Sequence, residues 1–314
     1  MNLKSKKILV GIFSYNEGEN LRSIYGQIKT QCKDIDYKIV LLDESDENKS
    51  TDIVSEILKD QKVEKLTKGP RKGKSSGYNL LFKYFLDNDF NILLHFDADH
   101  VLSGEVVRNL AETIDKGFDV STCLNKPFKP LNMFQRVLYV LTMPATLERE
   151  DGTFVLPLVG HNGAYSRKAV SYIGKIPKGG IDEEMFILSK VLFYNLSYTI
   201  VRNSISYFTL PGTLEDYIQS TRRVYGKVKA FNEWHPIMDK NGEESSDPNH
   251  VVKKIYSFSP FKIIIQSLLS DLFASIFAPY IFIIRWTLLR TTRIYESDTW
   301  EAIETTKILK GGLI

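Results

Sequence analysis

Cysteine is scarce in this chain of 314 residues, and its scarcity limits how the fold can be held together. Cys32 and Cys123 are the only two, and they stand in unrelated contexts without CxxC or metal-ligand spacing. A disulfide framework and a cysteine-rich zinc site are both excluded by this usage. We expect two free thiols and a reducing compartment.

The chain also lacks a strong excess of one charge. Its 41 basic and 38 acidic side chains give a formal net charge of +3. Nucleic-acid-binding domains usually gather a conspicuous surplus of Lys and Arg on one face, so we expect no nucleic-acid partner, whereas a small anionic substrate stays open. The basic start, Met1 to Lys7, precedes a short apolar run that ends at Ser14 to Glu17, which predicts a strand and not a secretion signal.

An uninterrupted hydrophobic run of membrane-spanning length is missing as well. The most apolar stretch, Ile263 to Ile284, is broken by Gln266, serines, Asp271 and Pro279. A spanning helix needs about 20 mostly apolar residues, and a charge at its centre costs roughly 2.5–3.5 kcal/mol. The stretch therefore favours an interfacial or re-entrant helix pair, with a buried helical core or a dimer interface as the alternative. Basic residues that suit anionic lipid head groups surround it: Lys253, Lys254, Lys262, Arg285, Arg290 and Arg293.

What the sequence does contain is an alternation of short β-rich apolar runs with helical patterns over its first two-thirds. This order is typical of an α/β fold with a mostly parallel sheet and crossover helices on both faces. Strands are predicted at Lys7–Phe13, Tyr37–Leu42, Val63–Leu66 and Asn91–Phe96, and helices at Asn20–Gln31, Thr51–Lys59 and from the segment Lys68–Gly77 to Leu86. We expect a catalytic domain over residues 1–226, a connecting segment over 227–255 and a C-terminal membrane-associated helical module over 256–314.

Polar side chains follow three of these predicted strands. Asn16, Asp43 and Asp97 all stand at carboxyl ends, where open α/β sheets bind their ligands. The strongest local signal is the segment His95 to His100, in which Asp97 and Asp99 are separated by one residue. Carboxylates of this kind suit Mg²⁺ or Mn²⁺, hard cations that also need substrate phosphates. A plain strand-terminating turn is the alternative, because Asp is common in turns.

A second hypothesis comes from the glycine-rich segment Gly69 to Ser75, which resembles a Walker A loop. Ile92 to Asp97 similarly resembles the apolar strand and acid of a Walker B motif. The spacing fails, because a P-loop has four residues between its glycines and this segment has three. A P-loop-like NTPase stays an alternative, and the basic loop remains a candidate for contact with phosphates.

Together these pieces resemble the family 2 glycosyltransferases of GT-A fold, over roughly Lys7 to Gly226. The resemblance rests on Ile8 to Glu17, Leu41 to Asp46 with Ser50 to Asp52, Lys72 to Asn79, and the metal motif Asp97-Ala98-Asp99. It implies that the nucleotide is contacted by Tyr15, Asn16, Glu17 and Asp43, that Lys74 lies beside the donor, and that Asp97 and Asp99 hold the metal.

Three later segments extend the resemblance. Val159 to Arg167, with His161, is similar to the loop that faces the transferred sugar and the acceptor. Asp182-Glu183-Glu184 is similar to the acidic helix start that supplies the general base, with Asp182 the first choice and Glu183 the second. Tyr217 to Arg223 resembles the Gln-x-x-Arg-Trp signature of membrane-associated members: Gln219 and Arg222 match it, and Arg223 replaces the Trp.

The resemblance implies an inverting, metal-dependent hexosyl transfer from a UDP- or GDP-linked sugar, with Mn²⁺ or Mg²⁺ as cofactor. The acceptor is expected to be lipid-linked or a glycan displayed at the membrane, and the enzyme a peripheral or monotopic protein on the cytoplasmic face of the cell membrane. Besides the NTPase, a non-catalytic nucleotide- or glycan-binding scaffold is the remaining alternative.

Overall fold

The computed structural model describes residues 3–46, 49–67, 71–151, 162–178, 180–239 and 271–293. Within this part of the chain the strands form one eight-stranded sheet in the order β3-β2-β1-β4-β7-β6-β8-β5. The strands are β1 (Lys7–Ser14), β2 (Asp36–Asp43), β3 (Val63–Lys65), β4 (Ile92–Asp97), β5 (His100–Ser103), β6 (Val120–Pro127), β7 (Asn162–Ser166) and β8 (Tyr198–Phe208). The helices are η1 (Leu3–Ser5), α1 (Glu19–Gln31), α2 (Thr51–Ile57), α3 (Lys74–Asp87), α4 (Val106–Asp115), α5 (Met133–Asp151), α6 (Arg167–Ile173), α7 (Glu183–Phe193), α8 (Leu214–Asp239) and α11 (Leu272–Thr291).

The first half of the sheet is parallel, as the alternation of patterns predicts. Strands β3, β2, β1 and β4 run in one direction, and each predicted strand and helix of residues 7–97 is found within a few residues of its predicted bounds. Beyond β4 the sheet becomes mixed, because β7 pairs antiparallel with both β4 and β6. Strands buried on both faces read as continuous apolar runs, which is why β1 and β4 were recognisable in the sequence.

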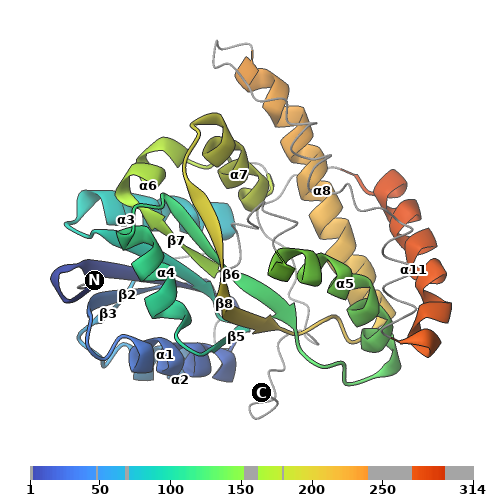
Figure 1. Ribbon diagram of the computed structural model, residues 1–314, viewed down its shortest axis with the longest axis horizontal. Helices are drawn as coiled ribbons and strands as arrows, with labels where there is room; N and C mark the ends of the chain where they lie inside the picture. Colours follow the sequence, from blue (N-terminus) through green and yellow to red (C-terminus); the bar gives the residue numbers. More distant parts are fainter. Residues whose placement is uncertain are drawn as a thin grey trace.

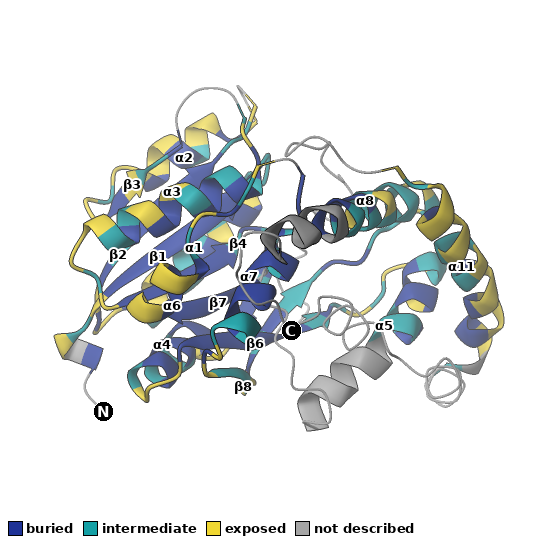
Figure 2. Cartoon of the chain, turned by 90° about the horizontal axis from the view of Figure 1, so that it is seen from above, coloured by how far each residue is buried: buried dark blue, intermediate teal, exposed yellow. Residues whose placement is uncertain are grey.

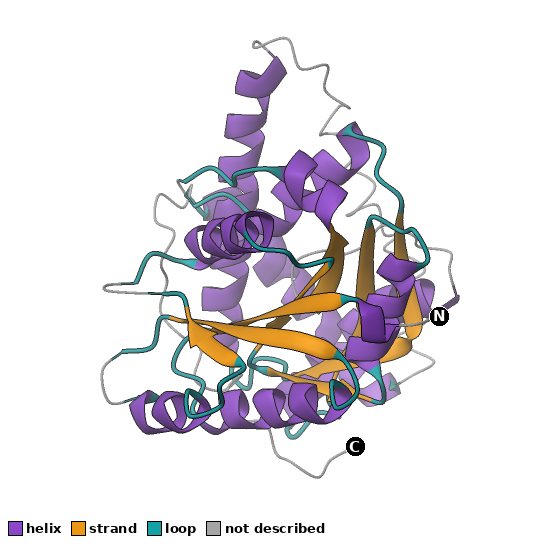
Figure 3. Ribbon diagram, turned by 90° about the vertical axis from the view of Figure 1, so that its left-hand side faces the viewer, coloured by secondary structure: helices purple, strands orange, loops and turns teal. Residues whose placement is uncertain are grey.

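Helices cover both faces of the sheet (Figures 1 and 3). On one face, α1, α2 and α4 contribute to a core that includes Ile24 and Leu110. On the other, α3, α6 and α7 contribute to a core that includes Tyr78 and Phe186. Alternate residues of β4 serve the two cores, with Leu94 in the first and Leu93 in the second. The predicted α/β class with helices on both faces is confirmed.

Helix α3 lies unusually close to β1 because two glycines leave room for it. A Cβ atom on Gly77 of α3 would lie 2.8 Å from the ring of Phe13, and one on Gly11 of β1 would lie 2.6 Å from the side chain of Leu81. Both distances are shorter than real carbon contacts allow. The two positions therefore fix the first turn of α3 directly over the end of β1.

A third packed region lies beside the sheet, where α5, α8 and α11 meet (Figure 1). Its small core includes Val137 and Leu138 of α5 and Ile281 of α11. Helix α8 is continuous across residue 226, the predicted end of the catalytic domain, and the predicted start of the C-terminal module at 256 lies outside the described residues.

The first part of the expected helix pair, residues 263–270, lies outside the described residues, and in the part that is described the chain is not broken at Pro279. Asp271 caps the start of α11 by accepting a hydrogen bond from the Ala274 amide at 3.0 Å, and a single helix then continues through Pro279. Proline removes one backbone donor and crowds the preceding turn, but this position is exposed and the break is not made. Among the described residues α11 is the one helix long and apolar enough to cross a membrane.

Candidate functional site

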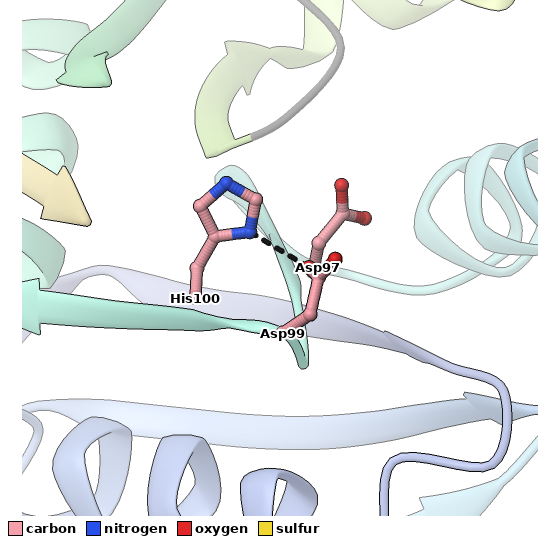
Figure 4. Close-up of side chains that lie close together, drawn as sticks. All are labelled: Asp97, Asp99 and His100. Carbon is pink, nitrogen blue, oxygen red and sulfur yellow. Dashed lines mark hydrogen bonds and ion pairs between the residues drawn. The ribbon is translucent and has the colours of Figure 1, made fainter. Parts of the chain in front are cut away.

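The predicted metal-binding acids lie where β4 turns into β5 (Figure 4). Asp97 ends β4, Asp99 lies in the turn and His100 begins β5, and their candidate ligand atoms all lie within 4.8 Å of one another. The Asp99 Oδ1 and His100 Nδ1 atoms are 2.8 Å apart. Burial acts to raise the pKa of Asp99, but the charge and hydrogen bond of His100 outweigh it and lower the pKa. Two carboxylates and an imidazole fit a divalent cation.

Lys74 connects the predicted metal-binding acids to α3. It occupies the first position of the helix, and its Nζ lies 2.8 Å from Oδ2 of Asp97. Burial acts to lower the pKa of Lys74, whereas Asp97, Glu184 and Glu183 raise it, and the result lies above the ordinary value. The side chain is therefore a stable cation at the edge of the candidate site.

Asn162 fixes the end of β4 from the neighbouring strand. Its Oδ1 accepts a hydrogen bond from the Asp97 amide at 3.0 Å, and its Nδ2 donates to Oγ of Ser206 at 2.7 Å. One fully buried side chain thus ties β4, β7 and β8 together at the candidate metal site. Sequence reasoning did not identify Asn162. His161, the predicted acceptor-facing residue before it, lies outside the described residues.

The turn after β1 has the predicted nucleotide-facing residues in a network of hydrogen bonds. Asn16 adopts a left-handed conformation with φ of 57°. It exchanges two hydrogen bonds with Asp46: its Nδ2 donates to the carboxylate at 2.8 Å, and the Asp46 amide donates to its Oδ1 at 2.9 Å. The Tyr15 hydroxyl donates to the same carboxylate at 3.1 Å, and Arg71 stacks 3.5 Å over the Tyr15 ring. The turns after β1 and β2 are thereby joined.

Asp43 and Glu17 complete this edge of the sheet. Asp43 is buried at the end of β2, where its carboxylate accepts from Lys65 at 3.0 Å and from Ser45 at 2.5 Å. Glu17 accepts a hydrogen bond from Asn20 at 3.0 Å at the start of α1. Because β2 and β4 flank β1 in parallel register, Asp43 and Asp97 lie on either side of the end of β1, as their positions at strand ends predict.

A second group of acids begins α7. Asp182 caps the helix, and its Oδ1 accepts a hydrogen bond from the Met185 amide at 2.9 Å. Burial, assisted by Glu184 and Glu183 against the opposing charge of Lys227, raises the pKa of Asp182 to about 6. Asp182 and Glu184 are both half-buried. Burial and the neighbouring glutamates thus outweigh the capping hydrogen bond from Met185, which acts to lower the pKa of Asp182.

Glu183 differs from its two neighbours because it points into the protein. It is 4% exposed; its Oε2 accepts from Lys227 of α8 at 2.7 Å and its Oε1 accepts from the Ser75 hydroxyl at 3.1 Å. Burial acts to raise the pKa of Glu183, but Lys227 and Lys74 lower it. A carboxylate whose two oxygens are both engaged in the core is poorly placed to take a proton from a substrate. The geometry thus favours Asp182 over Glu183.

The two groups of acids meet through consecutive residues of α3. Lys74 pairs with Asp97, and the next residue, Ser75, donates to Glu183. The predicted residues Gln219, Arg222 and Arg223 lie on the first half of α8, where Arg222 is exposed and the other two are half-buried. The contact of α8 with the α7 acids is made about one turn later, by Lys227, which sequence reasoning did not identify.

These features define an α/β protein with a candidate ligand site at the carboxyl ends of its parallel strands, where carboxylates suited to a metal are connected to a second acidic group through Lys74 and Ser75. Residues 9–174, slightly more than half of the chain, match Glycosyl transferase family 2. The chain belongs to this family, and the GT-A-like fold agrees with the resemblance found in the sequence.

Two relatives illustrate the similarity. The chain is 27% identical over 115 residues to a dolichol-phosphate mannosyltransferase of Pyrococcus furiosus, an alignment that covers 37% of this chain and 32% of the relative. The chain thus spans about a third of that relative's length. Its fold is similar to the mannosyltransferase PcManGT of Pyrobaculum calidifontis, solved with GDP-Man and Mn²⁺, with a TM-score of 0.58 and 15% identity over 91% of this chain and 84% of the other.

Proposed function

We propose that the protein transfers a hexosyl group from a nucleotide-diphosphate sugar to a hydroxyl of an acceptor at a membrane surface, with inversion at the anomeric carbon. The observation that carries this proposal is the pairing of two acidic groups across the start of α3. Asp97 and Asp99 offer ligands for a cation, and Asp182 begins α7 on the other side of Lys74 and Ser75. Family membership supports the same reading over that of a P-loop-like NTPase.

The metal-binding acids and Lys74 serve the leaving group. Asp97 and Asp99 would hold Mn²⁺ or Mg²⁺, and the bound cation would supply positive charge to stabilise the departing diphosphate. Lys74 adds a fixed positive charge beside Asp97. This ammonium group orients a phosphate oxygen of the donor and is already protonated. Asn162 holds the backbone of Asp97, and the close packing of α3 on β1 holds the start of the helix that carries Lys74, so little reorganisation is needed when the donor binds.

Asp182 serves the acceptor. As a general base it takes the proton from the acceptor hydroxyl while that oxygen bonds to the anomeric carbon, and the bond from that carbon to the diphosphate oxygen breaks on the opposite face. Base assistance of this kind contributes about 10²–10⁴-fold in rate. A pKa of about 6 leaves Asp182 ionised at neutral pH yet basic enough to accept the proton.

Helix α11 supports an acceptor at a membrane surface. Its inner face packs on α5 and α8, and its outer face is apolar and exposed (Figure 2). Trp286 on that face carries the Arg290 guanidinium 3.8 Å from its ring, an arrangement suited to the boundary between lipid chains and anionic head groups. The large apolar residues exposed on α11 are Phe273, Ile276, Phe277, Tyr280, Ile283, Trp286 and Leu289.

The contacts of α11 favour a helix lying along the membrane over one that crosses it. Its start is joined to α5 by an ion pair between Asp271 and Arg136. Further along, Arg285 donates to the Tyr225 hydroxyl at 3.2 Å, and past its end the Thr292 carbonyl accepts from Lys229 at 2.6 Å. A helix fastened at both ends to the body of the protein presents only one face to lipid. Free, buried cysteines support a cytoplasmic location.

Thermal stability measured with candidate donors tests the proposed reaction. GDP- and UDP-linked hexoses are compared with the free nucleotides and with ATP, each with and without Mn²⁺ or Mg²⁺, because a ligand of the native state raises Tm. We expect a metal-dependent rise for one nucleotide sugar, followed by sugar transfer to a lipid-phosphate acceptor in vesicles. Asp99→Asn should abolish the metal dependence, whereas Asp36→Asn, at the opposite end of β2, should not. A rise with ATP and hydrolysis of its terminal phosphate would favour the NTPase instead, and binding without transfer would favour the scaffold.

A further inference from the structure

The ion pair between Lys227 and Glu183 is buried more completely than the other Lys or Arg ion pairs of the described residues. Lys227 is 6% exposed and Glu183 is 4% exposed, and their Nζ and Oε2 atoms lie 2.7 Å apart. The pair joins α8 to the first turn of α7, two helices that are separated in the sequence by β8. It is not part of the proposed metal site, and Glu183 does not serve as the proposed base.

Stability alone is a weak reason for such a pair. Removing two charges from water costs several kcal/mol per ion, and an apolar pair of similar volume often stabilises a protein equally well. A buried pair is better suited to specify one arrangement of the elements that carry it, because any shift leaves charges without partners. Glu183 also accepts from Ser75, so the arrangement it specifies includes the start of α3.

The three elements joined here each carry a part of the proposed reaction centre. Ser75 follows Lys74, which pairs with Asp97. Glu183 follows Asp182, whose carboxylate caps α7. The hydrogen bond between Ser75 and Glu183 therefore fixes the distance between the two groups, because Lys74 next to Ser75 contacts Asp97 and Asp182 next to Glu183 is the proposed base.

We propose that Lys227 is a positioning residue for the transfer reaction: its buried ion pair with Glu183 holds the first turn of α7, and with it the Asp182 carboxylate, against the start of α3. This inference rests on the proposed function. Lys227 does not contact the substrate and acts through Glu183.

The charges around Asp182 give this role a second consequence. Glu183 and Glu184 on α7 raise the pKa of Asp182, and Lys227 on α8 opposes them. Across the site, Lys74 of α3 interacts with both glutamates and with Asp97 of β4. Removing the Lys227 charge leaves the carboxylates unopposed from the α8 side, so the acidic limb of the rate profile should move to higher pH.

The test compares Lys227→Met with two further variants of the full chain. Lys190→Met is the matched control, because Lys190 is also a buried lysine in this layer but lies about two turns along α7 from the acids. The double variant Lys227→Met with Glu183→Gln removes both charges and retains an acceptor for Ser75, so it should fold even if the single variant is unstable. The readouts are Tm, donor affinity, the pH profile of kcat, and hydrogen exchange of the Met185 amide, which donates to Asp182.

For Lys227→Met we expect kcat to fall by up to about 10²-fold with donor affinity unchanged, as for a displaced reacting group. The acidic limb of the pH profile of kcat should move to higher pH, and the Met185 amide should exchange its hydrogen faster. The double variant should recover Tm but not kcat, and Lys190→Met should lower Tm alone. If folded Lys227→Met keeps both the acidic limb of its pH profile and the hydrogen-exchange rate of the Met185 amide unchanged, the proposal is overturned. If the unaltered protein transfers no sugar, the proposed function fails, and Met185 exchange still decides whether Lys227 positions Asp182.

Discussion

Three consecutive carboxylates begin α7, and each meets a different environment. Asp182 caps the helix at a half-buried position, Glu183 turns into the core towards Lys227, and Glu184 remains half-buried. Adjacent residues on a helix point about 100° apart, so only some of these side chains can face the same ligand. The environment, and not the residue type, therefore separates the proposed base from the residue that holds it.

The pH dependence of transfer follows from the raised pKa of Asp182. A base must be ionised, so we expect kcat to be maximal above a pH of about 6 and to decline as the pH falls through that value. Asp182→Asn should bind donor normally and lose transfer by roughly 10²-fold or more. Measuring transfer by Asp182→Asn, Glu183→Gln and Glu184→Gln side by side decides the assignment. An inactive Glu184→Gln beside an active Asp182→Asn would show that Glu184 is the base.

At the scale of single elements, the placement of α3 depends on the absence of two side chains. Gly77→Ala should lower the free energy of unfolding by roughly 1–3 kcal/mol, because its Cβ would overlap the Phe13 ring. Gly26→Ala in α1 is the matched control: its Cβ meets open space, so it should raise that free energy by roughly 0.5–1 kcal/mol. Urea denaturation measures both. Equal effects would show that α3 can move away from β1 without cost.

The exposed apolar face of α11 predicts membrane binding that can be tested by substitution. Ile276→Glu with Ile283→Glu should weaken co-sedimentation with anionic vesicles by at least about tenfold. Both side chains are exposed in the protein, and each contributes about 1.5–3 kcal/mol when it enters the bilayer. Leu58→Glu, an exposed leucine at the end of α2, should leave it unchanged. Point substitutions are sharper than removal of residues 256–314, which also uncovers Val137 and Leu138. Full vesicle binding by the double variant would exclude α11 as the docking face.

The sequence predicted elements where local pattern decides structure. The strands β1 to β4 and their polar ends followed from apolar runs that stop at Asn16, Asp43 and Asp97. The partners that complete the site could not be found in this way. Lys227 lies 44 residues from Glu183, and Ser75 lies 108 residues from it, so no local spacing records their contact. Pro279 is a local signal that α11 does not follow, because the helix continues through this exposed position.

Across the whole molecule, α8 contacts both α7, which carries the proposed base, and α11 of the α5–α8–α11 region (Figure 1). Lys227 reaches α7, whereas Tyr225 and Lys229 reach α11. At 100° per residue, positions 225 and 229 lie on nearly the same face of a helix and position 227 on the opposite face. The contacts with α7 and with α11 therefore use opposite faces of one continuous helix.

If the protein binds a donor and a bilayer as proposed, this arrangement predicts that the two binding events are coupled. If the bilayer shifts α8 against α7, it changes donor affinity by some factor, and the donor must then change bilayer affinity by the same factor. We expect the vesicle dissociation constant to change when nucleotide sugar and Mn²⁺ are added. The factor should approach one in Lys227→Met, in which the face towards α7 is disconnected. If the factor is one in the unaltered protein as well, α8 does not couple the two binding events, and the membrane serves only to bring the enzyme and its acceptor together on one surface.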